Sequence, residues 1–304
     1  MNSADALRPS NTRLTWKSCR STQVFLKDVT PFSTLVFSLL LAFPLWASTN
    51  IESKPCSQSL AMPVAADHKG LNQTLNVLVW NIEKAANPGW DADLNSLGGS
   101  SDLLLIQEAS IQAGIVNALP QPLYQAFAAG YTTEKQATGV LTLSSVEPSL
   151  QCNFTAWEPW LGTPKATNIT EYPIAGLEQR LLVINLHAVN FSMGMEEFNA
   201  QVRTLEPFLS QHLGPLIVAG DFNTWSSKRA TSLHSFMLSH QLSPVSFSPD
   251  QRTRFWDIPL DHVYLRGLNL INASTMKVES SDHNPLMITV EVPHCNDCTA
   301  QAPQ

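Results

Sequence analysis

The stretch that most constrains the fold of this chain is a short apolar run that ends abruptly in polar residues. Residues 215–218 carry no charge, and Ala219-Gly220-Asp221-Phe222-Asn223 follows them directly. A continuous apolar run that ends at a glycine is typical of a buried β-strand. The carboxylate and the amide after it are then placed at the edge of a sheet, where α/β proteins commonly keep their chemistry. Asp and Asn are also ordinary turn and cap residues, so this stretch alone leaves both interpretations open.

Further apolar runs in the chain end in the same way. We expect strands at residues 75–80, 102–106, 138–144, 181–186, 215–218, 260–265 and 286–292. The polar residues at or beside the ends of these runs are Asn81, Glu108, His187, Asn190, Asp221, Asn223, Asp261, Asp282 and His283. Strands that share a sheet edge would bring these side chains to one site.

The segments between the strands are a mixture of helices and loops. We expect helices over residues 111–120, 195–212 and 232–242, where apolar side chains recur at helical spacing. Residues 147–170 contain several Trp and Pro and are expected to form a loop, and little helical pattern follows Trp90. Strands alternate with helices in some places and follow one another directly in others, which favours a layered α/β sandwich over a barrel.

The composition of the polar set indicates which chemistry it supports. Oxygen donors dominate this set, two His are present and Cys is absent from it. Carboxylate and amide oxygens suit Mg²⁺ or Mn²⁺, whereas a zinc site would be expected to use more His or Cys. A hard divalent ion beside a His that passes protons is suited to phosphoester hydrolysis, because the ion neutralises charge that develops on the phosphoryl oxygens.

Six motifs, in this order, resemble a known superfamily. They are Trp80-Asn81-Ile82, Gln107-Glu108, His187-x-x-Asn190, Gly220-Asp221-Phe222-Asn223, Leu260-Asp261-His262 and Ser281-Asp282-His283-x-Pro285. Over roughly residues 75–292 the chain resembles the endonuclease/exonuclease/phosphatase superfamily, which includes DNase I-like nucleases, sphingomyelinases and inositol-phosphate phosphatases. Glu158-Pro159-Trp160 and Pro164-Lys165-Ala166 further resemble its bacterial YafD-like branch.

The resemblance implies an α/β fold, a four-layer α/β sandwich of two packed mixed β-sheets flanked by helices (DNase I-like). It also implies that Asn81, Glu108 and Asp282 hold a Mg²⁺ or Mn²⁺ ion. Taken singly, each of these residues has a structural interpretation as well, such as ending a strand or capping a helix. For His262 we expect only a structural role, because a residue directly after Asp261 faces the opposite side of the strand.

The resemblance implies catalytic roles for five further residues. His283 is the expected catalytic His, and Asp261 orients it by accepting a ring N–H. Asp221 is expected to position or activate the attacking water, and Asn223 to bind a phosphoryl oxygen. His187 is expected to donate to the phosphate or to act as a general acid.

Basic and aromatic residues flank the predicted site in the sequence. As a hypothesis, two loops form a lip that grips phosphate and stacks on a base or an acyl group. The side chains of this lip are Lys228, Arg229, Arg252 and Arg254, interleaved with Trp225, Phe255 and Trp256. Asn190, which supports His187, is expected to contact the substrate as well. Ordinary solvated loops with half-buried aromatic side chains would give the same pattern.

Three functions remain open. The first is a metal-dependent nuclease or general phosphodiesterase, which acts on a phosphodiester substrate that includes nucleic acid among the candidates. The second is a phospholipid or inositol-phosphate phosphoesterase at the cell envelope, and the third is a catalytically silent binding protein on the same fold. The net charge is −7, and residues 71–304 carry eleven Lys/Arg against twenty-one Asp/Glu. This balance argues against broad charge neutralisation of nucleic acid but does not exclude a nuclease.

The sequence divides into four parts. Residues 1–48 contain a basic segment and an apolar segment, residues 49–74 a polar linker, residues 75–293 the catalytic domain and residues 294–304 a tail. We expect the protein to be a monomer.

The amino-terminal part suggests a location. Residues 29–51 carry no charge and resemble a cleaved signal or a short membrane anchor, and an ordinary buried helix is also open. We expect a protein that is exported or anchored at the cell envelope, with a cytoplasmic protein that begins at Met62 as the alternative. Four cysteines then remain in the exported part and permit three pairings, namely those among Cys56, Cys152, Cys295 and Cys298.

Overall fold

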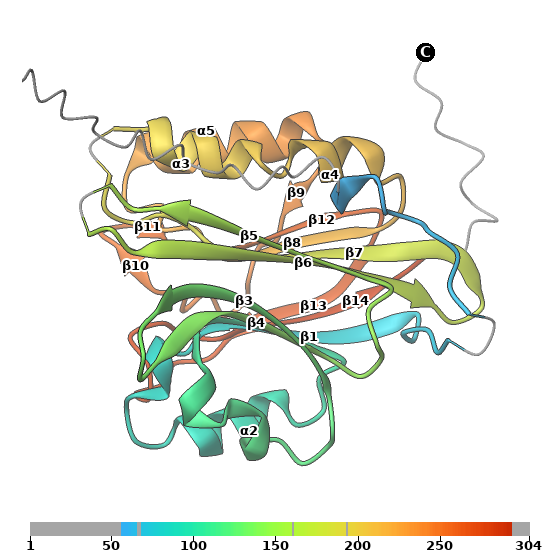
Figure 1. The fold of residues 1–304 in the computed structure, drawn as a ribbon, viewed down its shortest axis with the longest axis horizontal. Coiled ribbons are helices and arrows are strands. Elements are labelled where there is room, and N and C mark those ends of the chain that lie inside the picture. Colours follow the sequence, from blue (N-terminus) through green and yellow to red (C-terminus); the bar gives the residue numbers. More distant parts are fainter. Residues whose placement is uncertain (1–55, 66–67, 160, 193, 294–304) are drawn as a thin grey trace, which may run out of the picture. The chain divides into compact units, whose positions relative to one another are not determined.

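Two six-stranded β-sheets pack against each other at the centre of the fold (Figure 1). The computed structural model describes residues 56–65, 68–159, 161–192 and 194–293. One sheet is covered on its outer face by helices α3 (Glu196–Arg203), α4 (Glu206–Gln211) and α5 (Ser227–Ser239), and the other sheet by α2 (Trp90–Gly98). This order of helices, sheet, sheet and helix confirms the predicted four-layer α/β sandwich.

Both sheets are mixed and have related strand orders. The first sheet runs β13 (Asn269–Thr275), β14 (Leu286–Glu291), β1 (Thr74–Asn81), β2 (Leu103–Ser110), β4 (Ala137–Ser144), β3 (Tyr124–Thr132). The second sheet runs β5 (Leu150–Trp157), β6 (Pro164–Ile174), β7 (Leu177–His187), β8 (Leu216–Asp221), β12 (Asp261–Arg266), β9 (Ser243–Pro244). Each sheet has one parallel pair, β1 with β2 and β7 with β8, and the other neighbours are antiparallel.

Short elements complete the fold. They are the two-stranded ribbon of β10 (Arg254–Phe255) and β11 (Ile258–Pro259), and the 3₁₀ helices η1 (Glu83–Ala85), η2 (Ile111–Ala113) and η3 (Ile115–Ala118).

The central strands are apolar on both faces because both faces are covered. Along β1, Val77 and Val79 belong to the core between the sheets, whereas Leu78 packs on the α2 side. In β8, Ile217 faces the other sheet and Val218 faces the helices. A strand buried on both faces has a continuous apolar run rather than alternation. Burial of each such side chain stabilises the fold by about 1.5–3 kcal/mol.

The predicted loop over residues 147–170 is wrong. Strands β5 and β6 occupy most of this stretch and pair antiparallel from Leu150 to Trp157. Because one face of β5 is exposed, buried residues such as Cys152 and Phe154 alternate with exposed polar ones. That alternation is the ordinary signal of a half-exposed strand, but the Trp and Pro residues around it suggested a loop.

The helices in the structure also differ from the predicted ones. The helix expected over residues 195–212 is divided into α3 and α4, because Pro207 cannot donate a backbone hydrogen bond to the preceding turn. Residues 111–120 form two 3₁₀ turns on either side of Gly114, which has a φ of 66°. Helix α2 occupies the stretch after Trp90, where no helix was expected.

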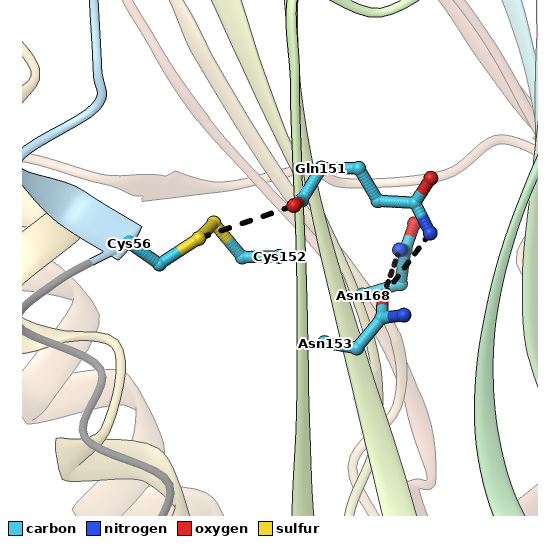
Figure 2. Close-up of a disulfide and its surroundings, with 5 residues drawn as sticks. All are labelled: Cys56, Gln151, Cys152, Asn153 and Asn168. Carbon is cyan, nitrogen blue, oxygen red and sulfur yellow. Dashed lines mark hydrogen bonds between the residues drawn. A yellow bond between two sulfur atoms is a disulfide. The ribbon is translucent and has the colours of Figure 1, made fainter.

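The described part of residues 49–74 is not a free linker, contrary to the prediction. Cys56 forms a disulfide with Cys152 of β5, with Cα atoms 6.2 Å apart (Figure 2). Leu71 is fully buried in the core between the sheets, and its backbone N–H donates to the carbonyl of Pro173 at 2.8 Å. The folded unit therefore begins upstream of residue 75, because this segment packs against the second sheet.

Several predictions fall on other parts of the chain. The proposed signal or anchor within residues 1–48, its apolar stretch 29–51 and the tail 294–304 lie outside the described residues. Cys295 and Cys298 lie there as well. Among the residues that the structure describes, no helix combines the length and the apolar character needed to cross a membrane.

Candidate active site

The second sheet lines up three polar side chains on adjacent strands. His187 at the end of β7 is in register with Asp221 at the end of β8, which is in register with Asp261 at the start of β12. Gly220 has a φ of 141°, and a Cβ at this position would lie 2.0 Å from the carbonyl oxygen of Leu186. Only glycine fits this close approach of β7 and β8, so the residue before Asp221 is set by the backbone.

Asp221 is held by residues from both sheets. Nδ2 of Asn81 donates to its Oδ2 at 3.0 Å, and the backbone N–H of Asn223 donates to its Oδ1 at 2.9 Å. Asn223 has a φ of 48°, and its Nδ2 donates to the carbonyl of Ala188 at 3.0 Å. Asn223 therefore orients Asp221, and the contact predicted with a phosphoryl oxygen would use the second N–H of the same amide, whose Nδ2 lies 3.5 Å from Oδ2 of Asp221.

His283 and Asp261 are in direct contact. Nδ1 of His283 lies 2.8 and 3.0 Å from the two carboxylate oxygens of Asp261, and its Nε2 lies 3.7 Å from Oδ2 of Asp221. Burial lowers the pKa of His283, but the Asp261 and Asp221 carboxylates outweigh burial and raise it to about 10. The ring is therefore an imidazolium at neutral pH. Trp80 Nε1 donates to the His283 carbonyl at 2.8 Å and fixes its backbone.

His187 lies among charged side chains. Its Nε2 lies 3.1 Å from Nζ of Lys165, 3.5 Å from Oδ2 of Asp221 and 3.9 Å from Oε1 of Glu108. Burial and the charge of Lys165 lower the pKa of His187 to about 4, against the opposing charges of Asp221 and Glu108. The ring is neutral at pH 7, and Nε2 accepts a hydrogen bond from the Lys165 ammonium. The donation from His187 to a phosphate stays a prediction, and the Lys165 ammonium lies beside this ring as a cation that sequence reasoning did not consider.

Glu108 lies at a β-bulge of β2 and has a φ of 50°. Its Oε2 lies 2.5 Å from Nζ of Lys84, and its Oε1 lies 3.9 Å from Nζ of Lys165. Burial raises the pKa of Glu108, but His187, Lys84 and Lys165 together lower it to about 2. Because His187 is itself neutral at pH 7, the two Lys are the charges that stabilise the carboxylate there.

The turn that carries Lys84 has an unusual backbone. Glu83, Lys84 and Ala85 have φ angles of 48°, 62° and 56°, a region that costs on the order of 1 kcal/mol for residues other than glycine. The backbone N–H of Asp282 donates to the Glu83 carboxylate at 3.0 Å and helps to hold this turn. The strained turn places Lys84 against Glu108.

The carboxylate ligands around Glu108 and Asp282 suit a divalent cation. Burial raises the pKa of Asp282, and the negative charges of Glu83, Glu108 and Asp221 raise it further against the opposing charge of His283. Carboxylates that repel one another in this way are stabilised by a shared cation. Their oxygens are the ligands preferred by Mg²⁺ and Mn²⁺.

A second group of potential ligands overlaps this one. Ligand atoms of Asp221, Asp261 and His283 lie within 4.8 Å of one another. Asp261 and His283 are hydrogen-bonded to each other at 2.8 Å, and the predicted ligands Glu108 and Asp282 do not belong to this group. Oδ1 of Asn81, the other predicted ligand, accepts from a backbone N–H at 3.1 Å.

Arg229 is not a lip residue, contrary to the prediction. The side chain is fully buried beneath α5. Its guanidinium donates at 2.7–3.0 Å to four groups, namely the carbonyls of Val189, Asn190 and Asn223 and the hydroxyl of Ser192. Arg229 therefore ties α5 to the loops that follow β7 and β8, and it cannot reach a substrate.

The other basic residues of the predicted lip are dispersed. Arg252 and Arg254 both donate to Oδ2 of Asp250, at 2.8 and 2.7 Å. The Arg252 side chain is only 12% exposed and also donates to the Asp261 carbonyl, so it helps to fix the backbone of Asp261. Lys228 is exposed on α5. The aromatic part of the lip is different, because Trp225 and Phe255 line a pocket.

Two pockets adjoin the polar cluster. The smaller, of about 350 Å³, is lined by Lys84, Glu108, Lys165 and His187 and is called the catalytic cleft below. The larger, of about 750 Å³, is lined mainly by apolar side chains and is called the apolar pocket. Asn190 lines both and lies between them.

Sequence reasoning assigned no role to three charged residues of the cleft. They are Lys84, Lys165 and Glu158. Glu158 is 1% exposed, and its Oε1 accepts from the backbone N–H of Asn190 at 2.6 Å. The only signal for Glu158 and Lys165 was their place in segments shared with the YafD-like branch.

Comparisons with known proteins identify similar sequences and folds. A model described as the Endonuclease/Exonuclease/phosphatase family matches residues 78–283. A UPF0294 protein of Vibrio vulnificus is 42% identical over 228 residues, which cover 72% of this chain and 78% of that protein.

Two solved structures share the fold at low sequence identity. The human Nocturnin catalytic domain has a TM-score of 0.54 and 18% identity, with 75% of this chain and 97% of that chain covered. The Bacteroides thetaiotaomicron mannosyl-6-phosphatase has a TM-score of 0.52 and 14% identity, with 71% and 99% covered.

Proposed function

Because the chain belongs to the endonuclease/exonuclease/phosphatase family, we propose that it is a divalent-metal-dependent hydrolase of phosphodiesters. The observation that carries this proposal is the environment of Asp221. This carboxylate lies between the rings of His187 and His283, at 3.5 and 3.7 Å, and Asp261 contacts the other ring nitrogen of His283 at 2.8 Å and raises its pKa. A proton acceptor and a charged donor around one site are what the attack of water on phosphorus requires.

In this proposal each of the following site residues has a defined role. Asp221 accepts a proton from the attacking water as the water oxygen bonds to phosphorus. The Nε2–H of His283, kept cationic by Asp261, donates to a phosphoryl oxygen, and the Lys165 ammonium adds a second positive charge. The P–O bond to the leaving group breaks, and the leaving oxygen takes up a proton from solvent water, while Asp221 later returns its proton to solvent.

The metal site of this proposal consists of Glu108, Asp282 and Asn81. A bound Mg²⁺ or Mn²⁺ ion supplies charge neutralisation for the phosphoryl oxygens. Because Lys84 lies 2.5 Å from Glu108, an ion at this carboxylate has to displace the ammonium. Glu108→Gln is expected to weaken Mn²⁺ binding in calorimetry at least tenfold, whether or not the protein is active.

Hydrolysis of bis-p-nitrophenyl phosphate by the full-length protein tests the proposed activity. We expect turnover with Mg²⁺ or Mn²⁺ and none with EDTA. His283→Ala and Asp221→Asn are each expected to lower kcat/KM by about 10²–10⁴-fold, because each removes a group that acts in the transition state.

His234→Ala is the matched control, since this His is exposed on α5. Its activity should equal that of the unchanged protein. A folded protein that binds Mn²⁺ but hydrolyses no phosphodiester would favour the binding-protein alternative. A nuclease and a lipid phosphoesterase would both hydrolyse a phosphodiester by these steps. Their substrates differ in the organic groups that are bonded to the phosphate oxygens.

We further propose that the protein is exported or anchored at the cell envelope. The Cys56–Cys152 disulfide supports this location, because disulfides persist in oxidising compartments and are rare in the cytoplasm. Mass spectrometry of the mature amino terminus tests it. A terminus near Ser48, or an intact chain in the membrane fraction, is expected, whereas a start at Met62 would establish the cytoplasmic alternative.

A further inference from the structure

The apolar pocket adjoins the catalytic cleft. Its volume is about 750 Å³, and its apolar lining includes Leu161, Phe191, Trp225 and Phe255. Leu161, Phe191 and Asn190 line the catalytic cleft as well. One surface therefore has the phosphate-processing residues at one end and apolar side chains at the other.

The lining of the apolar pocket offers few polar groups to a ligand. Among the described residues that line it, none is charged. Ser192 Oγ already accepts from Arg229 at 2.8 Å, and Asn223 Nδ2 already donates to Ala188 at 3.0 Å. A ligand in this pocket consequently meets mainly carbon, which favours an uncharged and apolar group.

The pocket has a rigid floor and an exposed rim. Trp225 Nε1 donates to the Asn190 carbonyl at 3.2 Å, and the Arg229 guanidinium lies 4.5 Å from the Trp225 ring. At the rim, Leu161, Phe191 and Phe255 are 57%, 55% and 49% exposed. Large apolar side chains exposed around a concave site are typical of a binding surface.

The neighbouring cations do not form a track for a polyanion. Arg229 is buried, and Arg252 and Arg254 share Asp250. Single-stranded nucleic acid binds along grooves whose Lys and Arg side chains follow successive phosphates. Among the basic residues of the predicted lip, Lys228 alone is exposed without an ion-pair partner in the described part of the chain, and one such charge favours an apolar group over a run of nucleotides in this pocket.

We infer that the apolar pocket binds the aliphatic chain of an amphiphilic phosphodiester, with the chain attached close to the phosphate that occupies the catalytic cleft. The inference rests on the proposed function and names a substrate class for it. The full-length protein can be tested with alkyl p-nitrophenyl phosphates from methyl to octyl, below their micelle concentrations, with Mg²⁺ or Mn²⁺.

Release of p-nitrophenolate reports hydrolysis in this series. We expect kcat/KM to rise about twofold for each added methylene, and thus about 10²-fold from methyl to octyl, because each methylene leaves water. The p-nitrophenyl ester of thymidine 5′-phosphate is expected to react no faster than the methyl ester. A flat series, or preference for the thymidine ester, overturns the inference.

Variants at the rim test whether the preference for long alkyl chains comes from the apolar pocket or from exposed apolar side chains in general. Phe255→Ser and Leu161→Ser are each expected to reduce the octyl-to-methyl ratio to less than about tenfold. Ile271→Ser is the matched control, because Ile271 is 58% exposed on β13 in the other sheet. It should retain the full ratio, and an equal reduction in this control would also overturn the inference.

A binding measurement keeps the two proposals distinguishable. Calorimetry compares octyl phosphate with ethyl phosphate on the same proteins. Tighter binding of octyl phosphate that is lost in Phe255→Ser supports the pocket even if no ester is hydrolysed, an outcome in which only the proposed function fails. Equal binding of the two phosphates overturns the inference even if the esters are hydrolysed.

Discussion

Lys165 is the single residue whose position most changes the chemistry of the site. Its ammonium lies 3.1 Å from Nε2 of His187 and 3.9 Å from Glu108. We expect Lys165→Met to lower kcat/KM on bis-p-nitrophenyl phosphate about 10²-fold, because a preorganised positive charge is removed. The pKa of His187 should also rise from about 4, since the Lys165 charge helps to lower it.

Hydrolysis rates and an NMR titration of His187 measure these two effects of Lys165→Met. Lys135→Met, at an exposed turn, serves as the control and should change neither. An unaltered His187 titration in Lys165→Met would contradict the assignment.

His262 makes the stability of the fold depend on pH. Its Nε2 lies 2.8 Å from Oγ1 of Thr224, and burial together with the charge of Arg252 lowers its pKa to about 3. The unfolded chain takes up a proton below about pH 6.5, whereas the folded protein resists protonation down to about pH 3. The contribution of His262 to stability is therefore complete above pH 6.5 and declines as the pH falls through this window.

Urea unfolding at pH 6.5 and pH 5 measures this decline. The loss in unfolding free energy due to His262 is expected to be at most about 2 kcal/mol between these values. His262→Gln, which does not titrate, should lose correspondingly less over the same interval. Equal losses in the two proteins would exclude His262 as the source.

Helix α5 is fixed to the site by a side chain that points inward. Arg229 donates to three carbonyls and one hydroxyl, while the neighbouring Lys228 is exposed. We expect Arg229→Met to lower the unfolding free energy by about 3 kcal/mol or more, because buried carbonyls lose their donor. Lys228→Met should stay within about 0.5 kcal/mol of the unchanged protein.

Thermal or urea unfolding of the two variants tests whether Arg229 is structural and Lys228 is not. Comparable stability of Arg229→Met and Lys228→Met would contradict the structural role of Arg229. A change in KM with unaltered stability in Arg229→Met would instead restore its predicted place in the lip.

At the scale of the whole molecule, charge limits which polymers the protein can bind. The net charge is −7, and apart from the exposed Lys228 the cations around the site are paired with Glu108 and Asp250 or buried. We expect the protein in EDTA to bind duplex DNA more weakly than about 10⁻⁴ M at 150 mM salt, since non-specific binding depends on phosphate neutralisation. A gel shift at micromolar protein would disprove this expectation.

The sequence by itself determined the sandwich, the central strands and the polar residues at the strand ends. Strands covered on both faces need continuous apolar runs, so residues 75–80 and 215–218 are visible without any tertiary information. Asn81, Asp221 and His187 follow such runs directly, which is why the polar cluster was predictable as well. The same reasoning missed β5, because an edge strand carries a weaker, alternating signal.

Only the tertiary structure decided which charges neutralise one another and which side chains remain available to a ligand. Lys84 from the turn η1 and Lys165 from β6 meet Glu108, and Arg229 turns inward while Lys228 beside it faces solvent. A Lys or Arg side chain can be satisfied by any acceptor within its long reach, and the local pattern of a sequence holds no record of which acceptors the packing of two sheets will bring there.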